Sequence, residues 1–178
     1  MADVQTFLSD NKHLVKNTYL EQNSLLGLAL KNGHKEVAEL LLEFEPNLFH
    51  INDSGKSLLH LASSGGLPDF VQLLVDKGLK VNITDSGGYT PLHVTTWSKQ
   101  ALCAKVLVKN GADINARTKS EITPLLNAVL YDSFEVVKVL LENGANPLLE
   151  DRYGETAFQI ARKEKKLDIL KLLESYKR

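Results

Sequence analysis

Apolar residues recur along the chain with helical spacing in several short segments. They occupy positions i, i+1, i+3 and i+4, one face of a helix, in FVQLLV (70–75), CAKVLV (103–108) and VVKVLL (136–141). A glycine follows each segment three residues later, in the order Gly78, Gly111 and Gly144. Glycine readily adopts the left-handed conformation in which helices end. The pattern therefore predicts short helices, including one over about 101–109, each followed by a turn.

These segments belong to a repeat with a period of 33 residues. A hydroxyl residue recurs at this interval, in the set Ser24, Ser57, Thr90, Thr123 and Thr156. In every unit Leu or Phe follows two residues later and a small residue follows five residues later. The spacing predicts that each unit is a hairpin-like turn and two antiparallel helices. One unit cannot bury its apolar stripe alone, so stability comes from stacking neighbouring units.

The third repeat shows how one unit is expected to fold. Thr90 can cap the first helix, because its side-chain oxygen accepts hydrogen bonds from free N–H groups of the first turn. Pro91 then takes the first helical position, where no N–H is needed. Leu92 and Thr95 are expected to face the stack. The second helix is expected to present four residues to neighbouring units: Leu102, Cys103, Val106 and Leu107.

The bulk composition excludes several classes of protein. With 178 residues, 43% of them hydrophobic, the chain can bury a core, and its net charge of −1 produces no general attraction to nucleic acid or membranes. No apolar run reaches the roughly 18 residues of a membrane span, and the first residues lack the features of a secretion signal. Cys103 is the single cysteine, so we expect no internal disulfide and a reducing compartment, the cytoplasm or the nucleus.

Three segments resemble the ankyrin repeat: TPLH (90–93), GADIN (111–115) and GHKEVAELLL (33–42). The resemblance covers residues 19–178. It implies an all-α solenoid of stacked helix-turn-helix units with hairpin-like turns, in five repeats at about 19–51, 52–84, 85–117, 118–150 and 151–178. We expect residues 1–18 to form an N-terminal capping helix and a helix rich in Lys and Glu to cap the other end, which predicts a monomer.

No pattern outside the repeats indicates a catalytic, metal or cofactor site. His60 and His93 stand 33 residues apart, and the resemblance implies that both hydrogen-bond across neighbouring turns. A zinc site needs three or four converging ligands, which the histidine spacing does not supply. Cys103 lies on an apolar stripe, where a buried thiol is inert. We therefore expect no enzyme, no cofactor and no metal.

Two further motifs have both a functional and a structural interpretation. RKEKK (162–166) is a candidate nucleic-acid or nuclear-import patch, but Glu164 and Asp168 interrupt its charge, which favours a solvated cap. Asn82 and Asn115 follow second helices. The resemblance implies that such asparagines can be hydroxylated, whereas their residue type favours hydrogen bonds to the turn backbone.

Large apolar residues in the later repeats mark a predicted partner-binding surface. In ankyrin proteins the partner usually contacts the turn tips and the exposed ends of the first helices. At those positions repeats 1, 2 and 5 carry polar or small residues, whereas repeats 3 and 4 and the fifth turn carry Tyr89, Trp97, Ile122, Leu130, Tyr131 and Tyr153. Exposed apolar groups of this kind indicate binding. The alternative is that Trp97 and Tyr131 fold over to cover their own helices.

Two classes of function follow from the sequence. The first is a non-catalytic interaction module that binds a partner protein on its concave face and hairpin tips, as a regulatory subunit or adaptor. Chains of this size resemble ankyrin-only regulators of protein kinases, including the cell-cycle type, or of transcription factors, and a host-directed effector is a further alternative. The second class is an enzyme, which needs an acid–base pair or a nucleophile in a pocket. We expect a protein partner, without nucleic acid or membrane.

Overall fold

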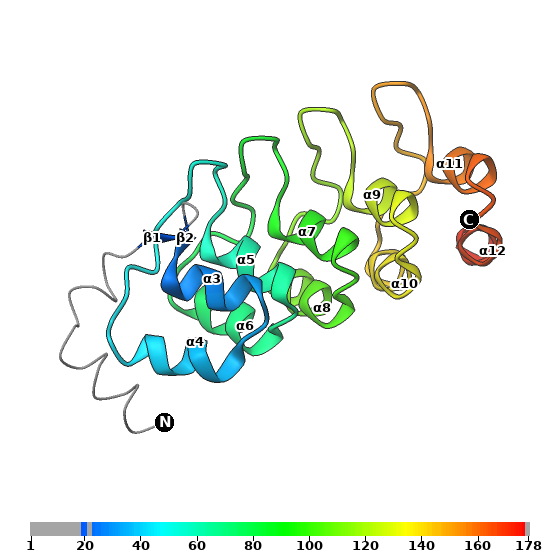
Figure 1. Cartoon of the computed structure of the whole chain (residues 1–178). Helices are drawn as coiled ribbons and strands as arrows, with labels where there is room; N and C mark the ends of the chain where they lie inside the picture. The colour runs from blue at the N-terminus through cyan, green and yellow to red at the C-terminus, as the bar shows by residue number, and fades with distance from the viewer. Residues whose placement is uncertain (1–18, 21–22, 177–178) are drawn as a thin grey trace.

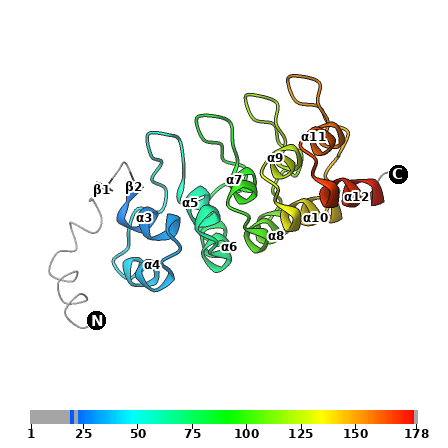
Figure 2. The same ribbon diagram turned by 45° about the vertical axis from the view of Figure 1, so that its right-hand side comes forward.

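The chain forms a row of stacked helix pairs (Figures 1 and 2). The computed structural model describes residues 19–20 and 23–176, and the predicted capping helix over residues 1–18 lies outside them. Within the described residues the pairs are α3 (Leu25–Lys31) with α4 (Lys35–Leu42), α5 (Leu58–Gly65) with α6 (Pro68–Asp76), α7 (Pro91–Trp97) with α8 (Ala101–Lys109), α9 (Pro124–Leu130) with α10 (Phe134–Glu142), and α11 (Ala157–Lys163) with α12 (Leu167–Ser175). This arrangement confirms the predicted all-α solenoid.

Long loops connect the pairs and project together from one side of the row, at the top of Figure 1. Two short strands, β1 (Tyr19–Leu20) and β2 (Asn23–Ser24), form an antiparallel pair just before α3. The first helices form one row, in which α3, α5, α7, α9 and α11 pack against one another in this order. The second helices α6, α8, α10 and α12 form another row. Apart from α4, each helix therefore packs against the other helix of its own pair and against at least one helix of a neighbouring pair.

Hydroxyl side chains cap several of the first helices, as the sequence predicts. Ser24 accepts a hydrogen bond from the Gly27 N–H at 3.0 Å, and Thr90 accepts one from the His93 N–H at 3.4 Å. Thr123 and Thr156 cap α9 and α11 in the same way. These helices have only seven residues, which is too short for independent stability, so the cap and the stack together hold them.

Two buried histidines connect consecutive repeats. The Nδ1 atom of His93 accepts from the Thr90 N–H at 3.2 Å, so its Nε2 carries the proton and donates to the Ile122 carbonyl at 3.1 Å. His60 bonds in the same way to Ser57 and to the Tyr89 carbonyl, at 3.2 and 3.0 Å. Both side chains are fully buried, so they act as structural links between loops, as the resemblance implied.

The turn between the two helices of each pair keeps a left-handed residue even where glycine is replaced. Gly66 has a φ of 71°, and at the same repeat position Lys99, Asp132 and Lys165 have φ values of 56°, 55° and 55°. A residue with a Cβ atom in this conformation costs roughly 1 kcal/mol or more. The stack therefore imposes one turn geometry on all these repeats.

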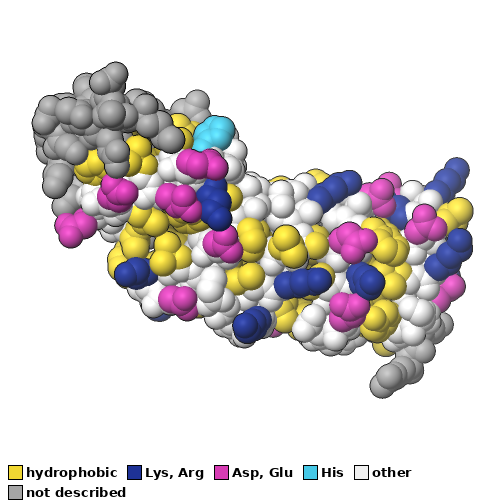
Figure 3. All heavy atoms as spheres, turned by 90° about the horizontal axis from the view of Figure 1, so that it is seen from below, with side chains coloured by type: hydrophobic (Ala, Val, Ile, Leu, Met, Phe, Trp, Pro, Cys, Tyr) yellow, Lys and Arg dark blue, Asp and Glu magenta, His cyan; other side chains and the backbone are white. Residues whose placement is uncertain are grey.

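One predicted contact of the second helix in repeat 3 is wrong. Cys103 and Leu107 are buried and Val106 is partly buried, but Leu102 is 64% exposed. Cys103, Ala104 and Leu107 form the stripe that faces the stack, and Leu102 lies one residue outside it, in the first turn of α8. Figure 3, seen from below Figure 1, shows such exposed hydrophobic side chains interspersed with charged ones.

A buried polar network joins repeats 3 and 4. The Thr96 hydroxyl donates to the His93 carbonyl and accepts from the Asn127 side-chain amide, both at 2.7 Å. Ser133 donates its hydroxyl proton to the Thr96 carbonyl. These side chains are all buried. Thr96 therefore binds α7 to the next repeat, whereas the hydroxyl of its neighbour Thr95 donates to the Leu92 carbonyl of the same helix.

Replacing Asn127 by Ala is expected to lower the free energy of unfolding by roughly 1–3 kcal/mol, because the buried Thr96 hydroxyl loses its donor. Urea denaturation of Asn127→Ala, Thr96→Val and the double variant measures this. The double variant should lose less than the sum of the single losses, since it removes both partners. Strictly additive losses would contradict a coupled network.

Folding stability should also depend on pH through the two histidines. Burial lowers the pKa of His93 to about 4 and also lowers the pKa of His60. The hydrogen bonds of both rings to backbone carbonyls raise these pKa values, but by less than burial lowers them. The unfolded chain, with a histidine pKa of about 6.5, binds more protons than the folded chain below that pH. The contribution of neutral His93 to the free energy of unfolding is therefore complete above about pH 6.5 and is lost as pH falls toward 4.

Between about pH 7 and about pH 5.5 we expect His93 alone to reduce the free energy of unfolding by roughly 1 kcal/mol. Urea titrations at both pH values measure the loss. His93→Gln, which does not titrate, should show a smaller loss over the same interval. An unchanged loss in this variant would mean that other groups cause the pH dependence.

Candidate functional site

Three aromatic rings meet on the surface formed by the loop ends and the first helices. Tyr89 lies at the end of the loop before α7, Trp97 is the last residue of α7, and Tyr131 follows α9. The ring centroids of Tyr89 and Trp97 are 5.3 Å apart with planes at 80°, and those of Trp97 and Tyr131 are 6.1 Å apart at 58°. This aromatic cluster (Tyr89, Trp97 and Tyr131) thus spans two repeats.

The aromatic cluster borders an open hollow of about 490 Å³. Lys56 and Asp85 also line it, so that the hollow contains one cation and one anion besides the rings. Asp85 Oδ1 accepts hydrogen bonds from the N–H groups of Gly87 and Tyr89 at 2.9 and 3.0 Å, which fixes the loop that carries Tyr89. The hollow therefore combines apolar ring surface with charged groups of both signs.

Lys56 and Asp85 are absent from the partner-binding set predicted from sequence. The sequence could have indicated Lys56, because it stands 33 residues before Tyr89 and so occupies the same repeat position. Asp85 gives no such signal: its position depends on how the loop turns back towards Tyr89. Its charge at the hollow becomes visible only in three dimensions.

The six predicted partner-binding residues differ in their surroundings. Tyr131 is 50% exposed and Leu130 is 40% exposed, and Tyr153 on the loop before α11 is 79% exposed. Tyr89 and Trp97 are half-buried in the aromatic cluster. The Ile122 side chain packs against the core, which leaves it less surface than predicted. The ring contacts recorded in the described part of the chain do not include Tyr153.

The Trp97 ring fits in part both interpretations made from the sequence, a partner-binding residue and a cover for its own helix. It is half-buried and contacts the rings of Tyr89 and Tyr131. It also lines the open hollow together with them. Trp97 is therefore held in one orientation by its neighbours while part of its surface stays accessible. A side chain fixed in this way loses little conformational freedom when a partner binds.

The titratable residues of the core are unsuited to catalysis or metal binding. Burial raises the pKa of the Cys103 thiol to about 12, so the reactive thiolate is disfavoured. His60 and His93 use both ring nitrogens for hydrogen bonds inside the fold. Among the residues that the structure describes, no group of three or more His, Cys, Asp or Glu side chains could hold a metal ion. A search of the same residues finds no helix that could cross a membrane.

The fold and this surface define a helical-repeat solenoid with a partly exposed aromatic cluster. A family model described as ankyrin repeats (3 copies) matches residues 3–85 and 26–118, and a model described as ankyrin repeats (many copies) matches residues 103–161. The chain therefore belongs to the ankyrin repeat family, whose repeats are protein–protein interaction modules. A search of curated proteins finds no match to the chain.

The Cys103 thiol is expected to react with a disulfide reagent such as DTNB at least roughly 100-fold more slowly in the native chain than in urea, because the thiolate is suppressed and buried. Absorbance at neutral pH follows the reaction. The double variant Leu102→Cys/Cys103→Ser is a matched control, since its thiol lies one residue away at an exposed position. Equal rates for the native chain and this control would contradict an inert Cys103.

Proposed function

We propose that the chain is a non-catalytic interaction module that binds a partner protein through the aromatic cluster. The observation that carries the proposal is the open hollow that Tyr89, Trp97 and Tyr131 line together with Lys56 and Asp85. Tyr and Trp at the centre of a surface patch, surrounded by charged groups, are typical of the residues that dominate the free energy of protein association.

The repeats themselves supply a comparison that supports this proposal. At the repeat position of Trp97 the other units carry Lys31, Ser64, Leu130 and Lys163. The same helix pairs form around all of these residues, so the fold does not require an aromatic ring there. Large rings that the fold does not require, kept partly exposed, are best explained by binding.

The charges at the rim restrict the partner's chemistry. A side chain that enters the hollow meets ring surface, an ammonium group on Lys56 and a carboxylate on Asp85. A partner segment with an apolar or aromatic anchor and polar groups of both signs beside it would complement all three. The captured partner then decides the biological role: a regulatory subunit or adaptor for a protein kinase or a transcription factor in the cytoplasm or nucleus, or a host-directed effector.

The test is affinity purification with mass spectrometry, comparing the wild-type chain with Trp97→Ala/Tyr131→Ala. We expect one protein to be enriched by the wild type and lost in the double variant, because truncation of two central aromatic side chains costs roughly 2 kcal/mol or more each. The binding of the purified partner, measured by calorimetry, should weaken by at least about 30-fold.

Leu102→Ala/Leu167→Ala is the matched control, because these residues are 64% and 65% exposed and do not line the hollow. This variant should retain the partner. Circular dichroism establishes that all variants fold. Equal retention by the aromatic double variant would reject the aromatic cluster as the binding surface.

A further inference from the structure

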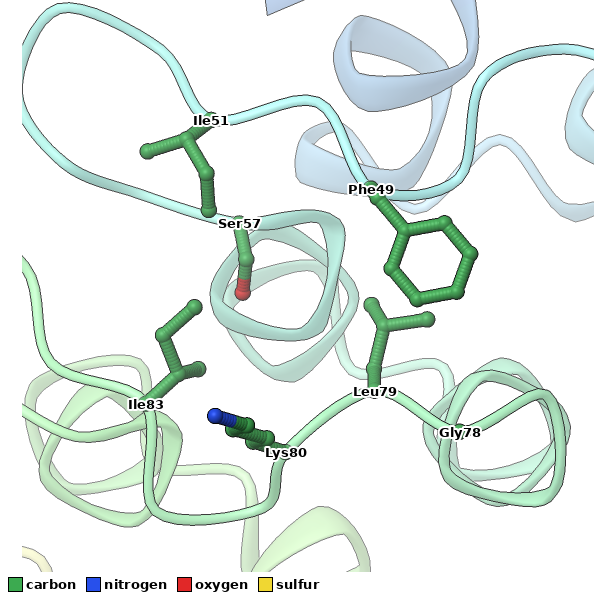
Figure 4. Close-up of a pocket in the computed structure, with 7 residues that line it drawn as sticks. All are labelled: Phe49, Ile51, Ser57, Gly78, Leu79, Lys80 and Ile83. Carbon is green, nitrogen blue, oxygen red and sulfur yellow. The ribbon is translucent and has the colours of Figure 1, made fainter.

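A second hollow, of about 280 Å³, lies between two consecutive loops. One loop leads from α4 to α5 and the other from α6 to α7. Figure 4 shows the Phe49 ring beside Leu79 on one side of this space, and Ile51, Ile83 and the Lys80 side chain on the other. We call it the Phe49 hollow.

The period of the chain explains why this space is open. At the repeat position of Phe49 the next two units carry asparagine. The Asn82 amide donates to the Gly111 carbonyl at 3.2 Å, and its oxygen accepts from the Asp113 N–H at 2.8 Å. Asn115 likewise accepts from the Asn146 N–H at 2.9 Å. Each asparagine thereby fastens one loop to the following loop.

Phe49 cannot make this link. The groups that an asparagine at this position would bond are the Gly78 carbonyl and the Lys80 N–H, and both residues line the Phe49 hollow. Among the hydrogen bonds of the described residues, none involves the Lys80 N–H. A backbone donor that is paired in the later repeats is therefore free here, at the edge of an apolar space.

Two more positions around this hollow differ from the other repeats in a related way. Ile51 is 43% exposed, and its equivalents Thr84 and Arg117 are polar. Lys80 replaces the equivalents Asp113 and Asn146, so that a positive charge stands where other repeats have an anion or an amide. Phe49 itself is 63% exposed. A closed polar junction has thus become an open apolar one that carries a cation.

We propose that the Phe49 hollow binds an extended segment of a partner protein in which an apolar side chain stands beside an Asp or Glu. The apolar side chain fills the space between Phe49, Leu79 and Ile83. The carboxylate pairs with the Lys80 ammonium group, and a backbone carbonyl of the segment accepts from the free Lys80 N–H.

The size of the hollow favours a peptide side chain over a free small molecule. Its volume of about 280 Å³ lies below the range of about 300–1,000 Å³ that is typical of small-molecule sites, and it suits one large side chain. The unpaired N–H beside it is the kind of group that binds the backbone of an extended segment.

The Phe49 hollow is separate from the aromatic cluster. Lys56 lines the hollow at the aromatic cluster and Ser57 lines the Phe49 hollow. Ser57 has extended backbone angles (φ −86°, ψ 169°), and consecutive side chains of an extended segment point to opposite sides. The two hollows therefore lie on opposite sides of one loop and share no lining residue.

The test is selection of peptides from a random displayed library on the immobilised full-length chain, followed by fluorescence anisotropy with the enriched peptides. We expect the wild type to enrich peptides with an apolar residue next to Asp or Glu. Phe49→Asn should weaken their binding by at least about tenfold, because the introduced asparagine would close the hollow as Asn82 closes its own junction. The melting temperature of this variant should equal or exceed that of the wild type.

Two further variants separate the contributions and control for surface changes. Lys80→Gln should reduce the preference for an acidic neighbour while it retains the apolar preference. Leu148→Asn changes an exposed leucine at the same repeat position outside the hollow, and should leave peptide binding unchanged. Trp97→Ala/Tyr131→Ala should also leave it unchanged, which distinguishes this site from the proposed function.

Three results would overturn the proposal. The first is the absence of an apolar–acidic preference among the enriched peptides. The second is undiminished binding by Phe49→Asn, or a melting temperature of this variant below that of the wild type, which would make Phe49 a structural cover. The third is binding of 3-phenylpropionate as tight as that of the peptides, which would assign the hollow to small apolar acids.

Discussion

The contact between neighbouring repeats is the constraint on which the rest of the structure depends. The helices have only seven to nine residues, and isolated helices of this length are not stable in water. The helices are held by packing against one another and by links such as the bond from His93 to the Ile122 carbonyl. A residue that faces the stack is therefore restricted by its neighbours, whereas a residue on the outer surface is restricted only by its own turn.

This division makes the repeats informative about one another. Where the stack requires a conformation, the chain keeps it at some cost, as the left-handed Lys99 and Asp132 show. Where the stack requires nothing, residues vary widely, and a large, only half-buried group such as Trp97 needs another explanation. Because a solenoid gains its stability one interface at a time, a local loss at one junction leaves the other junctions intact. Departures from the period are therefore tolerated one at a time, and they are the places where binding chemistry can be added.

Features with the period of the repeat could be predicted from the sequence. The helix over 101–109 and the Thr90 cap depend on residue type and spacing, and the resemblance to the ankyrin repeat implied the bonds of His60 and His93 across loops. Features that depend on the rotation of one helix against another could not. Leu102 lies one residue outside the buried stripe, and the Asn127 amide meets Thr96 only because two repeats bring them together. The association of Asp85 with the aromatic cluster also depends on the folded loop, in which its carboxylate accepts from the N–H groups of Gly87 and Tyr89.

The two hollows illustrate how a repeat can gain a surface without losing its fold. At the aromatic cluster the added groups are side chains at positions where repeats 1, 2 and 5 carry polar or small residues, so no link between repeats is lost. At the Phe49 hollow a link between loops is missing. Asn82 makes two hydrogen bonds to the following loop, each with a net value of about 1 kcal/mol, and Phe49 at the same repeat position makes neither. The helices on both sides still stack, because α3 packs on α5 and α5 on α7 beneath the loops. The loops can therefore change their chemistry because the helices, and not the loops, supply most of the buried apolar contact.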